Sequence, residues 1–422
     1  MKLFPTSKEA LASLTEWLVV FLCFAYPYPT CLSLALETNS TPINIAFRSL
    51  YLAMSLYLIF MSFLKKDTKI PSMALPLIFF WIIYVARILY DKEIRNIYTD
   101  HTKTEIYSFA LGNIFFPMFS TLLYGKYINL ERIKSNALWV LFGANLLIIT
   151  FYFKQISDIL TPAILLERAA IYSDAAKGYV INPISFSLYG GYLLIISLHY
   201  FLINQGSKKR RYVLIAAALL GLINLLLGAS RGPLAITVAS SFYLLLLHFK
   251  AATWTFNYVR RLLVTISILL GTYVFAILPL VSNFNFAIFG RVEQFVDERS
   301  AGKEEERDNL IRDAYEQFLD SPIFGDQMVS KTWGTYPHNI PMEVLMALGI
   351  VGGFLFSLIL LSFAIKFLNS SSYGEDFSFA LVLFMVAAGM TLTSGCLYQS
   401  VDYWNLAALV LCIPKQKVKK YF

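Results

Sequence analysis

The sequence predicts an all-α protein that crosses a membrane about twelve times. Of its 422 residues, 57% are hydrophobic and only 15% are charged, and its mean hydropathy is +0.61. A soluble domain rarely exceeds half apolar residues, so a soluble globular protein is excluded. Apolar runs long enough to cross about 30 Å of hydrocarbon recur along the whole chain. We expect spans at 14–36, 44–64, 70–90, 107–124, 136–153, 181–203, 212–229, 233–248, 262–281, 342–366, 377–396 and 397–414.

The first and the last predicted spans each have a distinctive feature. The run 14–36 is long and lacks a clear small-residue cleavage site, so we expect a retained span and no cleavable signal peptide. The last two spans are separated by little more than a turn, and the final one contains Asp402.

The distribution of charge predicts the orientation. If the first residue is cytoplasmic, the inside segments hold about 20 of the 35 basic residues but only about 5 of the 27 acidic residues. This asymmetry follows the positive-inside rule and places both termini in the cytoplasm. The net charge of +8 therefore reflects topology. The basic loops lack interleaved stacking aromatics, so we expect lipid headgroups as partners and no nucleic acid.

Cysteine and histidine usage argues against a metal site. The four cysteines all lie in apolar runs, where they fit as small buried hydrophobic residues. The four histidines are scattered, and no Cys/His spacing matches a zinc site. We expect no metal and no cofactor.

We expect a single membrane domain, 1–422, with no internal repeat and with outside segments at 91–106, 154–180 and 282–341. The longest, 282–341, contains "RDNLIRDAYEQFLDSPIFG". Its apolar residues fall at helical spacing: Leu310, Ile311, Ala314, Tyr315, Phe318 and Leu319. This spacing predicts a short amphipathic helix that ends at Ser321-Pro322, so we expect a folded loop.

The motif "LLLGASRGPLAI", 225–236, places a tight turn between two apolar spans on the outer side. Ser230 is suited to cap the following helix, with Arg231 and Pro233 in its first turn. An arginine beside the free N–H groups of a helix start can bind an anion. The alternative is that Arg231 only reaches lipid headgroups.

Other arginines accompany it. Arg291, Arg307 and Arg168 lie in outside segments, where each taken singly is an ordinary loop charge. Arg48 and Arg87 lie inside apolar spans, where a charge is costly and is usually functional or paired. Arg87, near the outer end of its span, could instead extend to the membrane surface.

A histidine stands where the long outside segment meets the next span, in "TYPHNIPMEVLMALGIVGG", 335–353. His338 is the only histidine of the loop 282–341. Asn339 can cap the helix and Pro341 fits its first turn. A histidine held at this point could accept a proton at neutral pH, or it could have only a structural role.

These motifs, in this order and on this side, resemble the O-antigen polymerase and O-antigen ligase superfamily. The resemblance rests on "SRGP", on "R-x4-R-x-A-x4-L-x-S-P-I-F-G" at 307–325 and on "HN-x-x-M-E-x-L-x-x-L-G-I-x-G" at 338–352, within about 220–365. It implies a C-type glycosyltransferase-like fold in the bacterial inner membrane. The implied donor is an undecaprenyl-diphosphate-linked glycan at the periplasmic face, used without a metal. A chain-length regulator protein is a candidate partner.

The resemblance also implies roles for individual residues. Arg231 corresponds to one phosphate-binding arginine, Arg291 or Arg307 to a second, and His338 to the family histidine, with Ser230 and Asn339 in support. Arginines can stabilise a diphosphate leaving group, and an imidazole can activate a sugar hydroxyl that attacks with inversion. We favour an O-antigen polymerase. The alternatives are a ligase that transfers glycan to lipid A core, a protein O-oligosaccharyl ligase, or a transporter or flippase.

Overall fold

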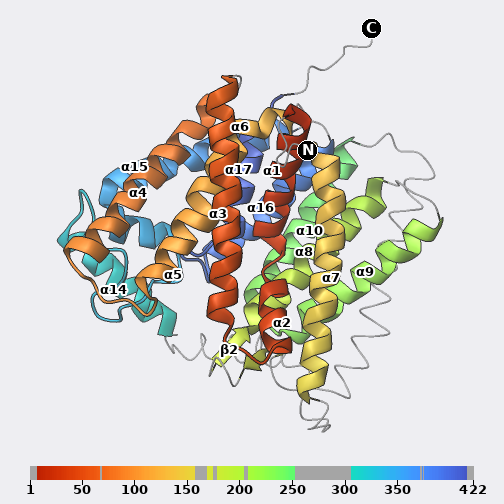
Figure 1. The fold of residues 1–422 in the computed structure, drawn as a ribbon, viewed down its shortest axis with the longest axis horizontal. Helices are drawn as coiled ribbons and strands as arrows, with labels where there is room; N and C mark the ends of the chain where they lie inside the picture. The colour runs from red at the N-terminus through yellow and green to blue at the C-terminus, as the bar shows by residue number, and fades with distance from the viewer. Residues whose placement is uncertain are drawn as a thin grey trace. The chain divides into compact units, whose positions relative to one another are not determined.

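The part of the chain that the structure describes is almost entirely helical (Figure 1). The structure is a computed structural model, and it describes residues 7–66, 69–156, 169–173, 178–203, 208–251, 306–370, 373 and 375–415. The strands β1 (Ile171–Ser173) and β2 (Gly178–Ile181) form an antiparallel pair.

The helices follow in chain order. They are α1 (Lys8–Phe24), α2 (Pro27–Ala35), α3 (Ser40–Lys65), η1 (Ser72–Ala74), α4 (Leu75–Leu89), η2 (Tyr90–Ile94), α5 (Lys103–Tyr107), η3 (Ser108–Phe115), α6 (Phe116–Tyr124), η4 (Gly125–Tyr127), α7 (Leu130–Ile156), α8 (Pro183–Ile203), α9 (Lys208–Leu227), α10 (Arg231–Ala251), α14 (Glu306–Asp320), α15 (Ile340–Leu368), α16 (Glu375–Thr391) and α17 (Val401–Cys412). Of these, η1 and η4 are 3₁₀ turns and η2 and η3 are π-helical stretches that continue their neighbours.

Seven helical segments in the described residues are long and apolar enough to cross a membrane, so the chain is an integral membrane protein. They correspond to the predicted spans 44–64, 70–90, 107–124, 136–153, 181–203, 212–229 and 342–366. The predicted span 262–281 lies outside the described residues. The described residues therefore account for seven of the twelve predicted spans as helical segments of sufficient length.

The remaining predicted spans differ from expectation. The run 14–36 is broken into α1 and α2, which meet at 65°, and the pair together could make an eighth span. Pro27 and Pro29 at the start of α2 cannot donate the backbone hydrogen bonds that would continue α1. The shorter apolar helices are the part Arg231–Leu247 of α10, the part Asp376–Thr391 of α16, and α17. The predicted boundary between the last two spans is wrong, because α16 ends at Thr391 and α17 begins only at Val401.

The chain divides into two compact units. Unit 1 comprises Met1–Cys23, Thr41–Asn136 and Glu304–Phe422, and unit 2 comprises Phe24–Ser40 and Ala137–Lys303.

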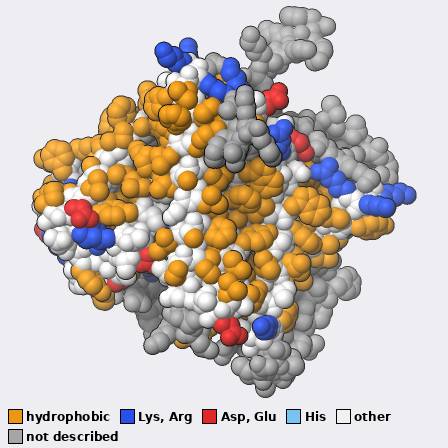
Figure 2. Space-filling model, viewed as in Figure 1, with side chains coloured by type: hydrophobic (Ala, Val, Ile, Leu, Met, Phe, Trp, Pro, Cys, Tyr) orange, Lys and Arg blue, Asp and Glu red, His pale blue; other side chains and the backbone are white. Residues whose placement is uncertain are grey.

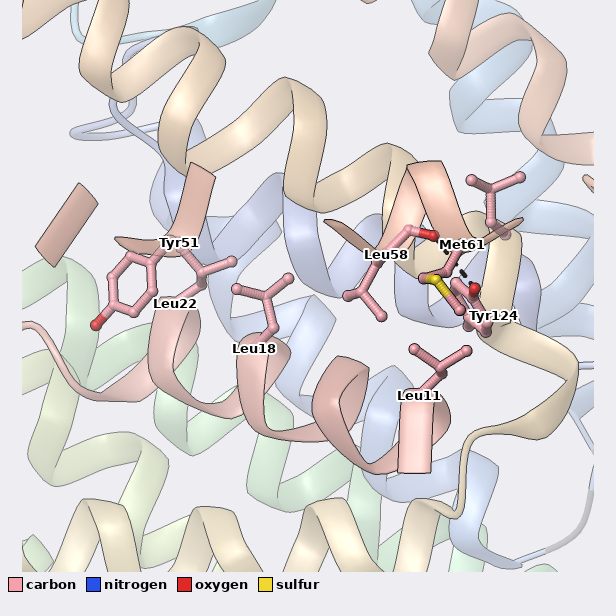
Figure 3. Close-up of a cluster of buried hydrophobic side chains, with 8 residues drawn as sticks. Leu11, Leu18, Leu22, Tyr51, Leu58, Met61 and Tyr124 are labelled. Carbon is pink, nitrogen blue, oxygen red and sulfur yellow. Dashed lines mark hydrogen bonds between the residues drawn. The ribbon is translucent and has the colours of Figure 1, made fainter. Parts of the chain in front are cut away.

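One apolar core of unit 1 lies where α1, α3 and α6 meet. Figure 3 shows Leu11 and Leu18 of α1 facing Leu58 of α3, with Tyr124 of α6 alongside. The Tyr124 hydroxyl donates to the Leu58 carbonyl at 3.2 Å, so its polar atom is satisfied inside the cluster. Burial of these side chains holds the three helices together.

A second core of unit 1 joins α4, α15 and α17 through aromatic side chains. Phe80 of α4 stacks on Trp404 of α17, with ring centroids 5.5 Å apart, and also contacts Phe356 of α15 at 6.0 Å. Trp81 meets the same Trp404 edge-on at 5.2 Å. These large buried rings fix α15 against its neighbours.

Unit 2 is organised by the close packing of α8 and α9. A Cβ atom on Gly190 would lie 2.5 Å from the Gly221 carbonyl oxygen, so the two backbones are in contact. A buried asparagine pair ties α7 to α9, because Asn224 Nδ2 donates to Asn145 Oδ1 at 2.8 Å. Small residues that permit close approach, with buried polar pairs, are typical of helix packing in membranes.

Helix α15 is interrupted at Gly349, whose φ of 61° and ψ of −154° are accessible essentially only to glycine. The turn 321–326 fills the interruption. The carbonyls of Pro322 and Ile323 accept from the amides of Ile350 and Val351 at 2.8 and 3.2 Å, and the Asp326 amide donates to the Met346 carbonyl at 2.9 Å. The turn thus replaces helical hydrogen bonds that the break removes.

Arg87 fastens the same turn to α4. It donates to the Phe324 carbonyl at 2.8 Å and to the Asp326 carbonyl at 2.9 Å. The buried Asp91 lies 3.7 Å from Arg87 and accepts the Met328 amide at 2.8 Å. Arg87 is therefore paired, as one of the two sequence interpretations required.

Arg48 is also paired, in α3. Its guanidinium donates to the Ser108 hydroxyl at 3.1 Å and lies 3.5 Å from the centroid of the Phe109 ring. These contacts offset the cost of a charge in an apolar span.

We predict that Gly349→Ala destabilises the protein by about 2 kcal/mol or more. An added Cβ would lie 2.5 Å from the Gly325 nitrogen and the Ile323 oxygen, in a backbone conformation that alanine strains to adopt. Gly353→Ala is the matched control, because its Cβ would meet only the tip of the Leu345 side chain at 2.9 Å. The apparent melting temperature in detergent measures both. Equal values for the two variants would contradict the role of the break.

Candidate functional site

The candidate site of unit 1 is built around the backbone between α16 and α17, residues 392–400, called here the connection. Arg307, in the first turn of α14, donates through Nη1 to the Thr393 carbonyl at 2.8 Å. Asn339 donates through Nδ2 to the neighbouring Leu392 carbonyl at 3.1 Å. Two residues singled out in the sequence, 32 positions apart, therefore bind adjacent carbonyls of a third segment.

His338 lies directly before the start of α15. The predicted helix start is confirmed, because the Asn339 side-chain oxygen accepts the Met342 amide at 3.0 Å as the N-cap and a proline occupies the first turn. His338 itself has a positive φ of 56°. Such a conformation is uncommon for a residue other than glycine and is often found at functional sites.

His338 stands at one end of a series of neighbouring rings. The Tyr336 ring meets the imidazole edge-on with centroids 4.6 Å apart, and Tyr398 of the connection lies 6.5 Å from Tyr336. Burial raises the pKa of Tyr336, and the nearby Arg307 opposes this effect only in part. The Tyr336 hydroxyl therefore keeps its proton at neutral pH and donates to Gln399 Oε1 at 3.4 Å. The second ring neighbour of Tyr398 is His101, at 6.3 Å.

Glu343 is the residue of this region that the sequence analysis did not select. Its side chain is fully buried in the first turns of α15. One carboxylate oxygen accepts the Leu397 amide at 2.9 Å, and the other accepts from the Tyr84 hydroxyl at 3.4 Å. The available signal in the sequence was an acidic residue inside an apolar helix, because burying such a side chain costs free energy and it is usually functional or paired.

Two buried side chains hold the connection at Leu397: Glu343 of α15 and Trp404 of α17. The Trp404 indole N–H donates to the Leu397 carbonyl at 2.8 Å, so both backbone groups of Leu397 are bound by buried side chains. This arrangement fixes the carbonyls that Arg307 and Asn339 contact. Glu343 therefore acts on the candidate site through the backbone.

Ser230 and Arg231 lie in unit 2, between α9 and α10. The chain reverses through Ala229, which has a φ of 44°, and the Leu234 amide donates to the Ser230 carbonyl at 3.2 Å. Ser230 thus occupies the N-cap position, and Arg231 is the first residue of the 21-residue helix α10. Its half-buried side chain stands at the positive end of the helix dipole, where an anion is favoured.

The predicted site residues therefore fall into three groups. His338, Asn339 and Arg307 lie together at the connection in unit 1, and Ser230 and Arg231 form the start of α10 in unit 2. Arg291 lies outside the described residues. Within the described ranges, no group of three or more His, Cys, Asp or Glu side chains is placed to hold a metal ion.

We predict that Glu343→Gln is tolerated and that Glu343→Leu is not. Glutamine keeps an oxygen that can accept the Leu397 amide, whereas leucine leaves that buried N–H unsatisfied, at a cost of about 1–3 kcal/mol. Hydrogen exchange of peptides that contain residues 392–400 reports the effect directly, beside the melting temperature. Unchanged exchange in Glu343→Leu would contradict the positioning role.

The comparisons with known proteins support one family. A comparison with curated proteins finds no match. A family model described as O-antigen ligase matches residues 216–357, about a third of the chain. The matched segment includes Arg231, Arg307, His338, Glu343 and the Gly349 break, and it ends before the connection. The resemblance to the O-antigen polymerase and ligase superfamily is therefore confirmed for residues 216–357.

Proposed function

We propose that the protein is an O-antigen polymerase. It transfers an undecaprenyl-diphosphate-linked glycan to a sugar hydroxyl of a lipid-linked repeat unit at the periplasmic face of the bacterial inner membrane. The observation that carries the proposal is the meeting of Arg307 and the His338–Asn339 pair at one connection, inside a segment that matches O-antigen ligase. The family match supports a membrane glycosyltransferase, and the polymerase reaction is our choice within it.

The proposed chemistry needs charge stabilisation and a proton acceptor. The acceptor oxygen attacks the anomeric carbon, the bond from that carbon to the diphosphate oxygen breaks, and undecaprenyl diphosphate leaves with the electron pair. Arg231 and one of Arg307 and Arg291 bind the diphosphate and stabilise its developing charge. His338 takes the proton of the attacking hydroxyl. Attack from the face opposite the leaving group inverts the anomeric carbon, and the arginines take the part that a metal ion has in other transferases.

The proposed membrane arrangement follows the charge asymmetry of the sequence. Twelve spans would place both termini in the cytoplasm and the loop 282–341, within a single membrane domain, in the periplasm. The donor and acceptor glycans then meet the loop residues on the outer side. A chain-length regulator protein is a candidate partner.

Two other functions remain as alternatives. An O-antigen ligase would use the same residues to transfer the finished glycan to lipid A core, and the matched family carries that description. A transporter or flippase would need no proton acceptor, so variants that remove only chemistry separate it from either transferase.

We predict that His338→Asn abolishes transfer while the protein remains folded. Asparagine tolerates the positive φ of this position better than most residues, so the change removes the base and keeps the backbone. Loss of a general base typically costs about 10²–10⁴ in rate. The measurement is glycan transfer by purified protein in lipid, with the melting temperature read in parallel. Asn339→Ala is the control for the cap, and it should lower stability by about 1 kcal/mol.

The glycan pattern in cells distinguishes the two transferases. A strain carrying His338→Asn should show core plus one repeat unit if the protein is a polymerase. A ligase should instead leave bare core, with polymer retained on undecaprenyl diphosphate. A normal ladder from the well-expressed variant would remove His338 from the mechanism.

We also predict that Arg231→Lys and Arg307→Lys each lower transfer by at least tenfold. A lysine ammonium cannot make the forked contact that a guanidinium makes with a phosphate. Arg312→Lys is the matched control on the same helix as Arg307, because Arg312 is exposed and contacts Asn309. Equal activity of Arg307→Lys and Arg312→Lys would leave the second phosphate contact to Arg291.

A further inference from the structure

We propose that the turn 321–325 is an interfacial membrane anchor, which inserts Ile323 and Phe324 into the bilayer surface beside α15. The inference does not depend on the reaction proposed above. It follows from the exposure of the turn, its fixed height on α15 and the pattern of exposed side chains along that helix.

The end of α14 and the turn present apolar side chains outward. Leu319 is 56% exposed, Ile323 is 60% exposed and Phe324 is 68% exposed. The opposite face of α14 is buried through Leu310 and Ala314. The outward side chains therefore take no part in the packing of α14 on unit 1.

The height of the turn along α15 is fixed by backbone hydrogen bonds. The carbonyls of Pro322 and Ile323 accept from Ile350 and Val351, directly after the break at Gly349. Arg87 of α4 binds the Phe324 carbonyl from the other side. The turn thus lies at the level of the break and of the end of α4, where Figure 1 shows α4 and α15 adjacent.

The exposure of the side chains of α15 changes at the break. Before the break, no residue from Ile340 to Leu348 is exposed, whereas Ile350, directly after it, is 57% exposed. Further exposed apolar residues follow toward the C-terminal end: Phe354, Leu360, Leu361, Ile365 and Leu368. The outer face of α15 is therefore suited to lipid only from Ile350 onward.

The length of that part of α15 matches a bilayer. The helix runs from Ile350 to Leu368, about 29 Å at roughly 1.5 Å per residue, against about 30 Å of hydrocarbon. The hydrocarbon boundary then falls at the break, beside Ile323 and Phe324. The start of α15 at Ile340 comes before the break, on the side away from Leu368, which places His338 outside the hydrocarbon.

Lipid is the occupant that the surroundings favour. The exposed turn is hydrogen-bonded to α15 beside the exposed Ile350 and to Arg87 of α4, and Leu89 and Tyr90, which follow Arg87 closely, are also exposed. Figure 2 shows hydrophobic side chains over the part of unit 1 where α4 and α15 lie in Figure 1. A tyrosine and an arginine at one level are typical of the boundary between hydrocarbon and headgroups.

The test places a nitroxide label at single cysteines in protein reconstituted into phosphatidylethanolamine and phosphatidylglycerol bilayers. Phe324→Cys is the test position, Phe354→Cys is the lipid reference, and Glu316→Cys, exposed on α14, is the water reference. The native cysteines Cys23, Cys31, Cys396 and Cys412 are buried, and unmodified protein carried through labelling measures their background.

Collisions with oxygen and with a water-soluble nickel chelate report the depth of each label. At position 324, as at 354, we expect the label to collide more often with oxygen than with the chelate. At position 316 we expect collisions with the chelate to be the more frequent. Dominance of the chelate at 324 would place the turn in water and overturn the proposal. Low access of both reagents at 324 would mean that protein, such as a second copy of the chain, covers the turn, which would also overturn it.

Discussion

The backbone hydrogen bonds between the turn 321–326 and the interrupted part of α15 are the constraint on which the rest of unit 1 depends. They fix the end of α14 at a single height on α15 and leave one face of the turn for Arg87. Each bond contributes only about 1 kcal/mol, but the arrangement requires the positive φ of both Gly325 and Gly349. Because α14 carries Arg307 and α15 begins beside His338, the same bonds join the two helices that carry the candidate residues.

The candidate site is made from irregular backbone whose polar groups must be satisfied. Where an apolar helix ends inside a membrane protein, its free carbonyls and amides need partners from the protein itself. Arg307, Asn339, Glu343 and Trp404 supply those partners to the connection. Residues proposed to act on substrate therefore also stabilise the local backbone. Only variants that preserve the backbone conformation, such as asparagine for His338, separate the two roles.

Several charged or acidic side chains within the helices of unit 1 bind backbone groups of another segment. Lys366 of α15 donates to the Val410 and Ile413 carbonyls at 2.9 and 2.5 Å, at the C-terminal end of α17. A cation at that point also complements the helix dipole. Arg87 and Glu343 also bind backbone groups, so these polar side chains connect segments that are distant in the sequence.

The sequence by itself determined the helical membrane class, most of the long spans, the start of α15 at Asn339 and the family of the segment 216–357. These features are encoded locally, by the length of apolar runs, by the capping residues and by short motifs in order. Tertiary structure alone decided the break at Gly349, the early end of α16 and the role of Glu343. Each depends on contacts between residues far apart in the chain, as between Arg307 and Thr393 or Glu343 and Leu397, and no local period records such contacts.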